Sequence, residues 1–121
     1  MNDFTIFVKN IFMIKAIIIE SEDRTRHLIS KTIESYCPNV GIVAQAIDIK
    51  SGISAINEHE PDLVLLDIKQ KDGSGFEILD HFSPPEFKVI FFSSYPDYAI
   101  KAIKYNAIDY ITKPIKEEEL A

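Results

Sequence analysis

The chain has 121 residues, 46% of them hydrophobic, which is enough for one compact domain with its own core. Its formal net charge of -6 argues against a nucleic-acid-binding surface within this chain, because such surfaces are usually basic. The single cysteine, Cys37, cannot form an internal disulfide, which suits a reducing compartment. No apolar stretch reaches the ~20 residues that a membrane-spanning helix needs, so we expect a cytoplasmic protein without membrane contact.

Strand and helix patterns alternate in the first half of the chain. Continuous β-branched runs are typical of strands buried on both faces, and apolar residues at helical spacing indicate amphipathic helices. Pro38 and Pro61 end the helices that precede them. In chain order we expect a strand at 15–19, a helix at 23–36, a strand at 41–46, a helix capped by Asp48 or Ser51, and a strand at 63–66.

The same alternation continues in the second half. The glycine-rich segment 72–75 predicts a flexible turn, and Pro96 suits the first turn of a helix. In chain order we expect that turn, a short helix with Phe76, Ile78 and Leu79 inward, a strand at 88–92, a helix whose packing face includes Ala99, Ile100, Ala102 and Ile103, and a strand at 108–112. Strands that alternate with helices predict a doubly wound parallel α/β sheet with helices on both faces.

Chemically active side chains follow or close four of these strands. They are the acidic cluster Glu20, Ser21, Glu22 and Asp23 after the first strand, Asp67 after the third, Ser93 after the fourth and Lys113 after the fifth. The carboxyl ends of parallel strands meet at one edge of a sheet, where open α/β folds bind their ligands. The sequence therefore predicts a phosphate and metal site at that edge.

Three stretches resemble a known family closely: PDLVLLDIKQKDGSGFEIL, VIFFSSYPDYAIKAI and NAIDYITKPI. They resemble the receiver domains of two-component response regulators, and the likeness runs over residues 13–119. The last two stretches are most similar to receivers of the LytTR class, which carry a DNA-binding output domain after the receiver. The resemblance implies a flavodoxin-like fold with five parallel strands in the order 2-1-3-4-5 and an active site beyond their carboxyl ends.

The resemblance implies a phosphoryl-transfer site around Asp67. A carboxylate is a poor nucleophile toward phosphorus unless a cation and a lysine neutralise the phosphoryl charge. By resemblance, Asp67 is the phosphoacceptor, and Lys113 pairs with the phosphoryl oxygens and precedes a cis bond to Pro114. Ser93 matches the switch hydroxyl, and Tyr110 matches the aromatic residue that moves with it. Taken alone, Asp67 would also fit a turn or capping aspartate, and Tyr110 a half-buried strand tyrosine.

The resemblance also implies that Mg²⁺ is the cofactor, held by Glu20, Asp67 and the backbone carbonyl of Lys69. The family has two adjacent acids after the first strand, but the second position here is Ser21. A serine removes one charged oxygen ligand, so we expect weaker Mg²⁺ binding unless Glu20 or Glu22 supplies that ligand. The acidic residues at 22–23 fit the first turn of a helix equally well, because the helix dipole favours negative charge there.

Two further side chains, Lys69 and Tyr95, occupy positions that tune the lifetime of the phosphoryl group in the family. Simple solvent exposure is the alternative explanation for both residues, and we favour the functional one. Lys71 replaces a proline that is often found in this loop, so we expect a more mobile loop.

The resemblance divides the chain into two parts. Residues 1–12 are expected to form an N-terminal extension, in which Phe4, Phe7, Val8, Ile11 and Phe12 have helical spacing. Residues 13–121 are expected to form the receiver, which stops where its fifth helix would begin, at the charged segment 116–119.

The predicted function is that of a receiver that takes a phosphoryl group from a phosphohistidine on a sensor kinase and switches an output domain outside this chain. We expect no enzyme beyond self-phosphorylation and self-dephosphorylation. A homodimer through helix 4, strand 5 and helix 5 is expected, with DNA contact only through the output domain. Two alternatives stay open. Ser21 suggests a degenerate receiver that acts by protein contact, and an Asp-nucleophile phosphatase would usually have a second aspartate where Lys69 stands.

Overall fold

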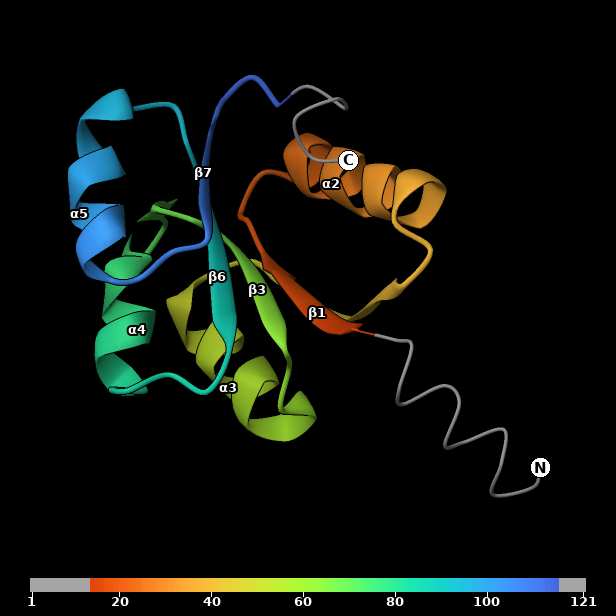
Figure 1. Ribbon diagram of the computed structural model, residues 1–121, viewed down its shortest axis with the longest axis horizontal. Coiled ribbons are helices and arrows are strands. Elements are labelled where there is room, and N and C mark those ends of the chain that lie inside the picture. The colour runs from red at the N-terminus through yellow and green to blue at the C-terminus, as the bar shows by residue number, and fades with distance from the viewer. Residues whose placement is uncertain (1–13, 116–121) are drawn as a thin grey trace.

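The computed structural model describes residues 14–115, which are built around one parallel sheet with strand order β2-β1-β3-β6-β7 (Figure 1). The sheet strands are β1 (Ile14–Ile19), β2 (Val40–Ala46), β3 (Leu63–Asp67), β6 (Lys88–Ser93) and β7 (Asp109–Thr112). A separate antiparallel pair consists of β4 (Lys69–Gln70) and β5 (Gly73–Ser74). The helices are α2 (Asp23–Tyr36), α3 (Ile49–His59), α4 (Phe76–His81), the 3-10 turn η1 (Pro96–Tyr98) and α5 (Ala99–Lys104).

The predicted flavodoxin-like fold is confirmed. The strands β1, β2, β3, β6 and β7 are the first to fifth predicted strands, so their spatial order is the expected 2-1-3-4-5, and every ladder between them is parallel. The structure also decides between the two possible caps of α3. Asp48 is the N-cap, and its side chain accepts a hydrogen bond of 2.8 Å from the backbone N–H of Ser51.

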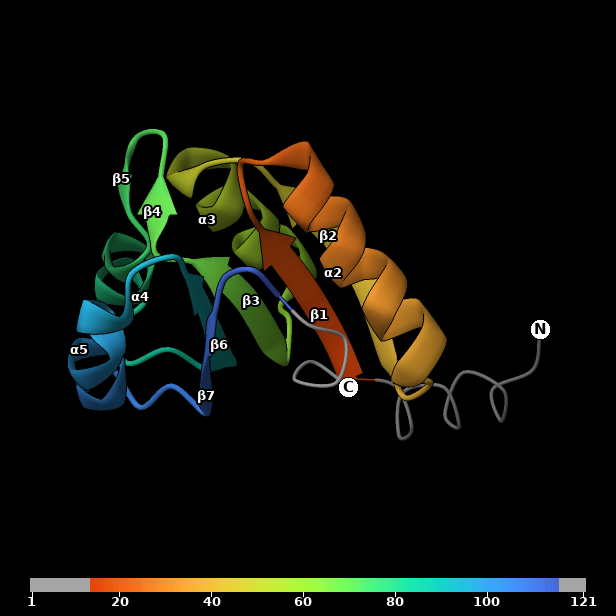
Figure 2. The same ribbon diagram turned by 90° about the horizontal axis from the view of Figure 1, so that it is seen from above.

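Helices cover both faces of the sheet (Figure 2). On one face, Ile29 and Ile33 of α2 pack on Ala16 and Ile18 of β1 and on their neighbours in the adjacent strands. On the other face, α3, α4 and α5 pack on a second cluster that includes Ile17 and Ile19, as expected from the alternation of side chains along a strand. The interior strands β1 and β3 are therefore buried on both faces of the sheet, which explains their continuous apolar sequences.

The β4–β5 hairpin was not predicted from the sequence, which indicated only a flexible turn. Two paired residues on each side carry no periodic pattern that could be recognised. The tip of the hairpin is fastened to α3, because the Asp72 carboxylate accepts hydrogen bonds from the backbone N–H groups of Ile49 (2.9 Å) and Lys50 (3.3 Å). The N-terminus of α3 is therefore capped by two carboxylates, those of Asp48 and Asp72. They accept hydrogen bonds from N–H groups that have no partner within the helix.

The predicted packing face of α5 is partly wrong. Ala102 is buried, but Ile100 and Ile103 are 71% and 72% exposed. These isoleucines lie three residues apart and share a face of the helix, and that face points away from the sheet. Ile108, just before β7, is also exposed, at 57%.

Several sequence-based expectations lie outside the described residues. These are the N-terminal extension at 1–12 with its helical spacing, and the charged helix start at 116–119. Among the helices of residues 14–115, none is long and apolar enough to cross a membrane.

Candidate functional site

Three charged side chains meet where β1, β3 and β7 end. Glu20 follows β1, Asp67 closes β3 and Lys113 follows β7. The Lys113 ammonium lies 2.5 Å from Oε1 of Glu20 and 2.9 Å from Oδ2 of Asp67. The strand ladders bring these residues together although Glu20 and Lys113 are 93 positions apart in the sequence. The expected convergence at the carboxyl edge of the sheet is therefore observed for these three groups.

The site is buried, and its neighbouring charges perturb the pKa values of Glu20 and Lys113. Glu20 is 1% exposed and Asp67 is 6% exposed. Burial raises the pKa of Glu20, and the neighbouring Asp67 raises it further, whereas the hydrogen bond from Lys113 lowers it. Burial lowers the pKa of Lys113, but its hydrogen bonds to Glu20 and Asp67 outweigh this effect and leave the pKa raised. The Lys113 ammonium is therefore held in place between two carboxylates, and its raised pKa favours the protonated form.

The donor set suits a hard divalent cation that keeps several water ligands. Within residues 14–115 no cluster of three or more histidine, cysteine or acidic side chains could enclose a metal. Mg²⁺ does not need such a cage, because it is usually bound through one or two carboxylates and retains waters. Glu20 and Asp67 supply two such carboxylates, and both lie within 3 Å of the Lys113 ammonium.

The rest of the acidic cluster serves the start of α2. The Glu22 carboxylate accepts a hydrogen bond of 2.5 Å from the Thr25 hydroxyl, and the exposed Asp23 pairs with Arg26 at 2.5 Å. Arg26 also donates to the backbone carbonyl of Glu20 at 2.9 Å, so it braces the residue that carries the buried acid. Sequence reasoning missed Arg26, although its spacing of three from Asp23 on a helix was a usable signal.

The predicted switch residues meet at one backbone carbonyl. The Ser93 hydroxyl accepts a hydrogen bond from the Tyr95 N–H (2.9 Å) and donates to the Tyr95 carbonyl (3.2 Å). The Tyr110 hydroxyl donates to the same carbonyl. The Lys69 ammonium lies 5.5 Å from the centre of the Tyr95 ring, within the range of a cation–π contact. Tyr95 therefore links the residues that the sequence analysis treated as separate pairs.

The backbone of Lys113 connects Ser93 to the charged cluster. The Lys113 N–H donates to the Ser93 carbonyl at 2.8 Å, which continues the β6–β7 ladder by one residue. The bond between Lys113 and Pro114 is cis, as the resemblance implied. Ser93 and Lys113 are thus held side by side at the edge where Asp67 lies.

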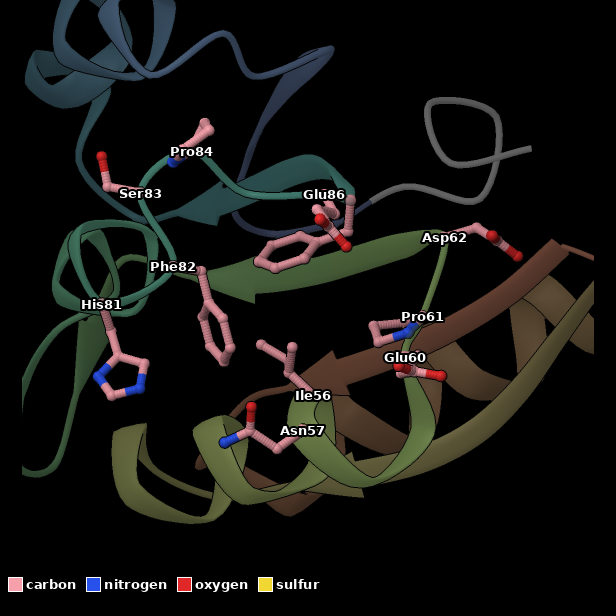
Figure 3. Close-up of a pocket in the computed structure, with 11 residues that line it drawn as sticks. Ile56, Asn57, Glu60, Pro61, Asp62, His81, Phe82, Ser83, Pro84 and Glu86 are labelled. Atoms are coloured by element: carbon pink, nitrogen blue, oxygen red, sulfur yellow. The ribbon is translucent and has the colours of Figure 1, made fainter.

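A pocket of about 640 Å³ lies away from this chemistry (Figure 3). It is lined by α3 near Ile56 and by the α4–β6 connection near Phe82, at the ends where β3 and β6 begin. Figure 3 shows Ile56 and Phe82 facing each other across it. None of the residues predicted for the phosphate and metal site lines this pocket. The candidate site is therefore the charged edge of the sheet and not this pocket.

Comparisons with known proteins agree with this architecture. A family model described as the response regulator receiver domain matches residues 16–121. The chain is 33% identical over 108 residues to an uncharacterized response regulatory protein of Vibrio cholerae, covering 88% of this chain and 41% of that protein. It is 31% identical over 116 residues to the sensory transduction protein LytT of Bacillus anthracis, covering 89% of this chain and 44% of LytT. The chain spans less than half the length of these curated relatives.

Solved structures show the same fold. The N-terminal domain of an uncharacterized protein from Wolinella succinogenes matches with a TM-score of 0.75 and 30% identity, covering 89% of this chain and 87% of that chain. A DNA-binding response regulator of the LuxR family from Staphylococcus aureus matches with a TM-score of 0.79 and 26% identity, covering 89% and 92%. This chain belongs to the response regulator receiver family and is a receiver domain of a two-component response regulator.

Proposed function

We propose that Asp67 accepts a phosphoryl group from a phosphohistidine of a sensor histidine kinase. The observation that carries the proposal is the Lys113 ammonium, which lies within 3 Å of both Asp67 and the buried Glu20. An Asp67 carboxylate oxygen attacks phosphorus, the phosphorus–nitrogen bond breaks, and its electron pair returns to the imidazole of the kinase. Lys113 neutralises phosphoryl oxygens as the charge on them is redistributed, which is how phosphoryl transfer is usually catalysed.

The metal is proposed to be Mg²⁺, bound by Glu20, Asp67 and the Lys69 carbonyl. Mg²⁺ bound there would neutralise phosphoryl charge and hold the incoming group in line with Asp67. Asp67 is already oriented, because Oδ1 accepts a hydrogen bond of 3.2 Å from the Lys69 N–H and Oδ2 accepts one from Lys113. Labelling of the protein by a small-molecule phosphodonor, with and without Mg²⁺, tests this function directly.

Restoring an acid at position 21 is expected to strengthen metal binding. In the Ser21→Asp variant a charged oxygen is added beside the cation, so the Kd for Mg²⁺ should fall by roughly tenfold. Ser21→Asn adds a neutral oxygen of similar size and is the control, with a smaller effect. Mg²⁺ titration by calorimetry provides the measurement. Equal affinities of the wild type and Ser21→Asp would mean that another acid already supplies this ligand.

A degenerate receiver is the second candidate function, and Ser21 favours it. The Glu22 carboxylate bonds to Thr25 at the start of α2, so using it as the replacement metal ligand would cost that hydrogen bond. If Mg²⁺ binding is too weak for phosphorylation, the domain would signal through protein contacts alone. The labelling experiment separates the two functions, because a degenerate receiver retains no label from the phosphodonor. Consumption of the donor without retained label would instead fit the phosphatase alternative.

The switch is proposed to act through Tyr95. A phosphoryl group on Asp67 adds roughly -1.5 to -2 charges and strong acceptor oxygens. The Ser93 hydroxyl would then leave the Tyr95 carbonyl and donate to a phosphoryl oxygen. Because Tyr110 bonds to the same carbonyl, this movement would shift the loop before α5 and repack Tyr110. The output is proposed to be a DNA-binding domain of the LytTR class, since relatives such as LytT are more than twice as long as this chain.

A homodimer through α5, β7 and the helix expected after residue 115 is proposed as the active form. The exposed Ile100 and Ile103 of α5 support it, because large exposed apolar groups on one face often mark an interface. In the full-length protein, beryllofluoride, which mimics a phosphoryl group, is expected to strengthen dimerisation. The Ile103→Glu variant should weaken the dimer by roughly tenfold or more, since it places a charge in the interface.

Sedimentation of the full-length protein with and without beryllofluoride measures this effect. The matched control is Ile47→Glu, because Ile47 is also exposed, at 45%, but lies between β2 and α3. An unchanged dimer constant in Ile103→Glu would place the interface elsewhere. If beryllofluoride has no effect in either the wild type or Ser93→Ala, the proposed coupling between the site and this face is wrong.

A further inference from the structure

A buried glutamine in the β4–β5 hairpin bonds to the backbone of the phosphoacceptor. Gln70 is 6% exposed, whereas its neighbour Lys69 is exposed, so the hairpin turns the amide inward. Its Nε2 donates to the carbonyl of Asp67 at 2.6 Å and to the carbonyl of Ile19 at 3.4 Å. The two acceptors belong to the ends of β3 and β1, the strands that carry Asp67 and Glu20.

The orientation of this amide follows from its partners. Both are carbonyl oxygens, which can only accept, so the amide nitrogen must face them. The amide oxygen of Gln70 then faces the other way, where no described residue donates to it. A buried acceptor without a partner destabilises a fold, and an apolar side chain of similar shape would avoid that cost. The amide nitrogen is therefore the part of Gln70 that calls for a functional explanation.

The two hydrogen bonds of Gln70 lie where the strand ladder between β1 and β3 ends. The last paired residues are Ile19 and Leu66, so Glu20 and Asp67 come directly after the final pair. Beyond that pair the backbone N–H of Glu20 donates to Ala46 of β2, and the N–H of Ile68 donates to Phe92 of β6. These two bonds connect β1 to β2 and the end of β3 to β6, and neither connects β1 to β3. Gln70 instead joins β1 and β3 to each other, at the residues Ile19 and Asp67.

The Asp67 carbonyl is also confined from a second side. Gly75 approaches it so closely that a Cβ at position 75 would lie 2.5 Å from the carbonyl oxygen. The Gly75 N–H donates to the Ile68 carbonyl at 2.5 Å, which fixes this approach. The carbonyl therefore sits between the Gln70 amide and the Gly75 backbone. Loss of the Gln70 bond would release one of these two restraints on the main chain of Asp67.

We propose that Gln70 is a positioning residue, which sets the separation of the Glu20 and Asp67 carboxylates so that one divalent cation can bind both. It acts through the main chain and touches neither the cation nor the phosphoryl group. This inference rests on the proposed phosphoacceptor function. It assigns Gln70 a role that its place in a short hairpin, outside the charged cluster, does not suggest.

The test compares Gln70→Met with Thr32→Val in the full chain. Methionine keeps the length of the side chain but removes the donor, and the Kd for Mg²⁺ should rise by about tenfold, as for other groups that hold metal ligands in place. The ¹³C NMR signals of the Ile19 and Asp67 carbonyls should shift as they lose their donor. The thermal midpoint should stay equal or rise, because the unpaired amide oxygen is removed. Thr32→Val also removes a buried oxygen without a partner, but in α2, and should leave Mg²⁺ binding unchanged.

Each outcome decides the inference. If Gln70→Met binds Mg²⁺ as tightly as the wild type, or loses thermal stability alone, Gln70 has only a structural role and the inference is wrong. If Gln70→Met does not fold, Gln70→Leu provides the same comparison with a second apolar side chain. If the wild type itself neither binds Mg²⁺ nor retains label, the proposed function fails, and the role of Gln70 fails with it. Wild-type binding with an unaffected variant overturns only the role of Gln70.

Discussion

Replacing Asp67 with asparagine is expected to abolish Mg²⁺-dependent labelling by a small-molecule phosphodonor. An amide oxygen is a far weaker nucleophile than a carboxylate, and the substitution removes the acid that Lys113 holds at 2.9 Å. Glu20 is the other carboxylate beside Lys113, so labelling that persists in Asp67→Asn would point first to Glu20. The retained label per protein, measured by intact mass spectrometry, should fall from near stoichiometric to background.

The matched control for this prediction is Asp62→Asn. Asp62 precedes β3, at the opposite end of the strand from Asp67, and accepts a hydrogen bond from the backbone of Lys15. Its loss changes the net charge by the same amount, so labelling should be unaffected. Stoichiometric labelling of Asp67→Asn would assign the phosphoryl group to another residue.

Lys113→Met is expected to have the second largest effect. The variant removes the cation that pairs with both carboxylates, so the labelling rate at saturating Mg²⁺ should fall by roughly 10²–10³-fold, the usual cost of losing one electrostatic stabiliser of a transition state. Lys88→Met is the control, because Lys88 is exposed at the start of β6, away from the site. A labelling rate within a factor of about two of the wild type would exclude a catalytic role for Lys113.

The Lys113→Met variant should also have a lower free energy of unfolding than the wild type in the absence of Mg²⁺. Glu20 is 1% exposed, and removing the partner of a buried charge leaves that charge uncompensated. We expect a loss of about 2 kcal/mol, below the range for fully buried pairs because the site lies at the edge of the sheet. Added Mg²⁺ should restore part of this loss by replacing the missing positive charge. Denaturant unfolding with and without Mg²⁺ measures both effects.

The loss of stability in Lys113→Met should also depend on pH. The pKa of Glu20 is raised in the folded protein, so the folded state binds its proton more readily than the unfolded chain. Ionisation of Glu20 therefore costs stability as the pH rises through that pKa. Without Lys113 the pKa of Glu20 rises further, because the hydrogen bond from Lys113 that lowered it is gone. The stability deficit of Lys113→Met should shrink as the pH falls from about 8 toward about 5.

Most of the architecture could be predicted from the sequence, because the pattern was strong. The continuous apolar runs of β1 and β3 are those of strands buried on both faces, and both strands lie at the centre of the sheet. The helix predicted at 23–36 is α2 with the same bounds. Family membership followed from motifs around Asp67, Ser93 and Lys113. These signals are local in sequence, so they can be recognised without knowledge of the tertiary structure.

Other features depend on contacts between distant parts of the chain, and only the tertiary structure decided them. Ile100 and Ile103 are exposed because α5 turns its Ala102 face to the sheet, and apolar residues on both sides of a short helix cannot reveal which side packs. Asp72 caps a helix that begins 23 positions earlier in the chain. Gln70 reaches the Ile19 carbonyl across 51 positions. The sequence by itself determined the alternation of strands and helices, the residues at the strand ends and the family, because periodicity and motifs depend on neighbouring residues. The strand order was implied only by the resemblance to that family, and the structure confirms it. The tertiary structure decided the hydrogen bonds that orient the residues at the strand ends, because these bonds join segments that are far apart in the sequence and that no local sequence pattern connects.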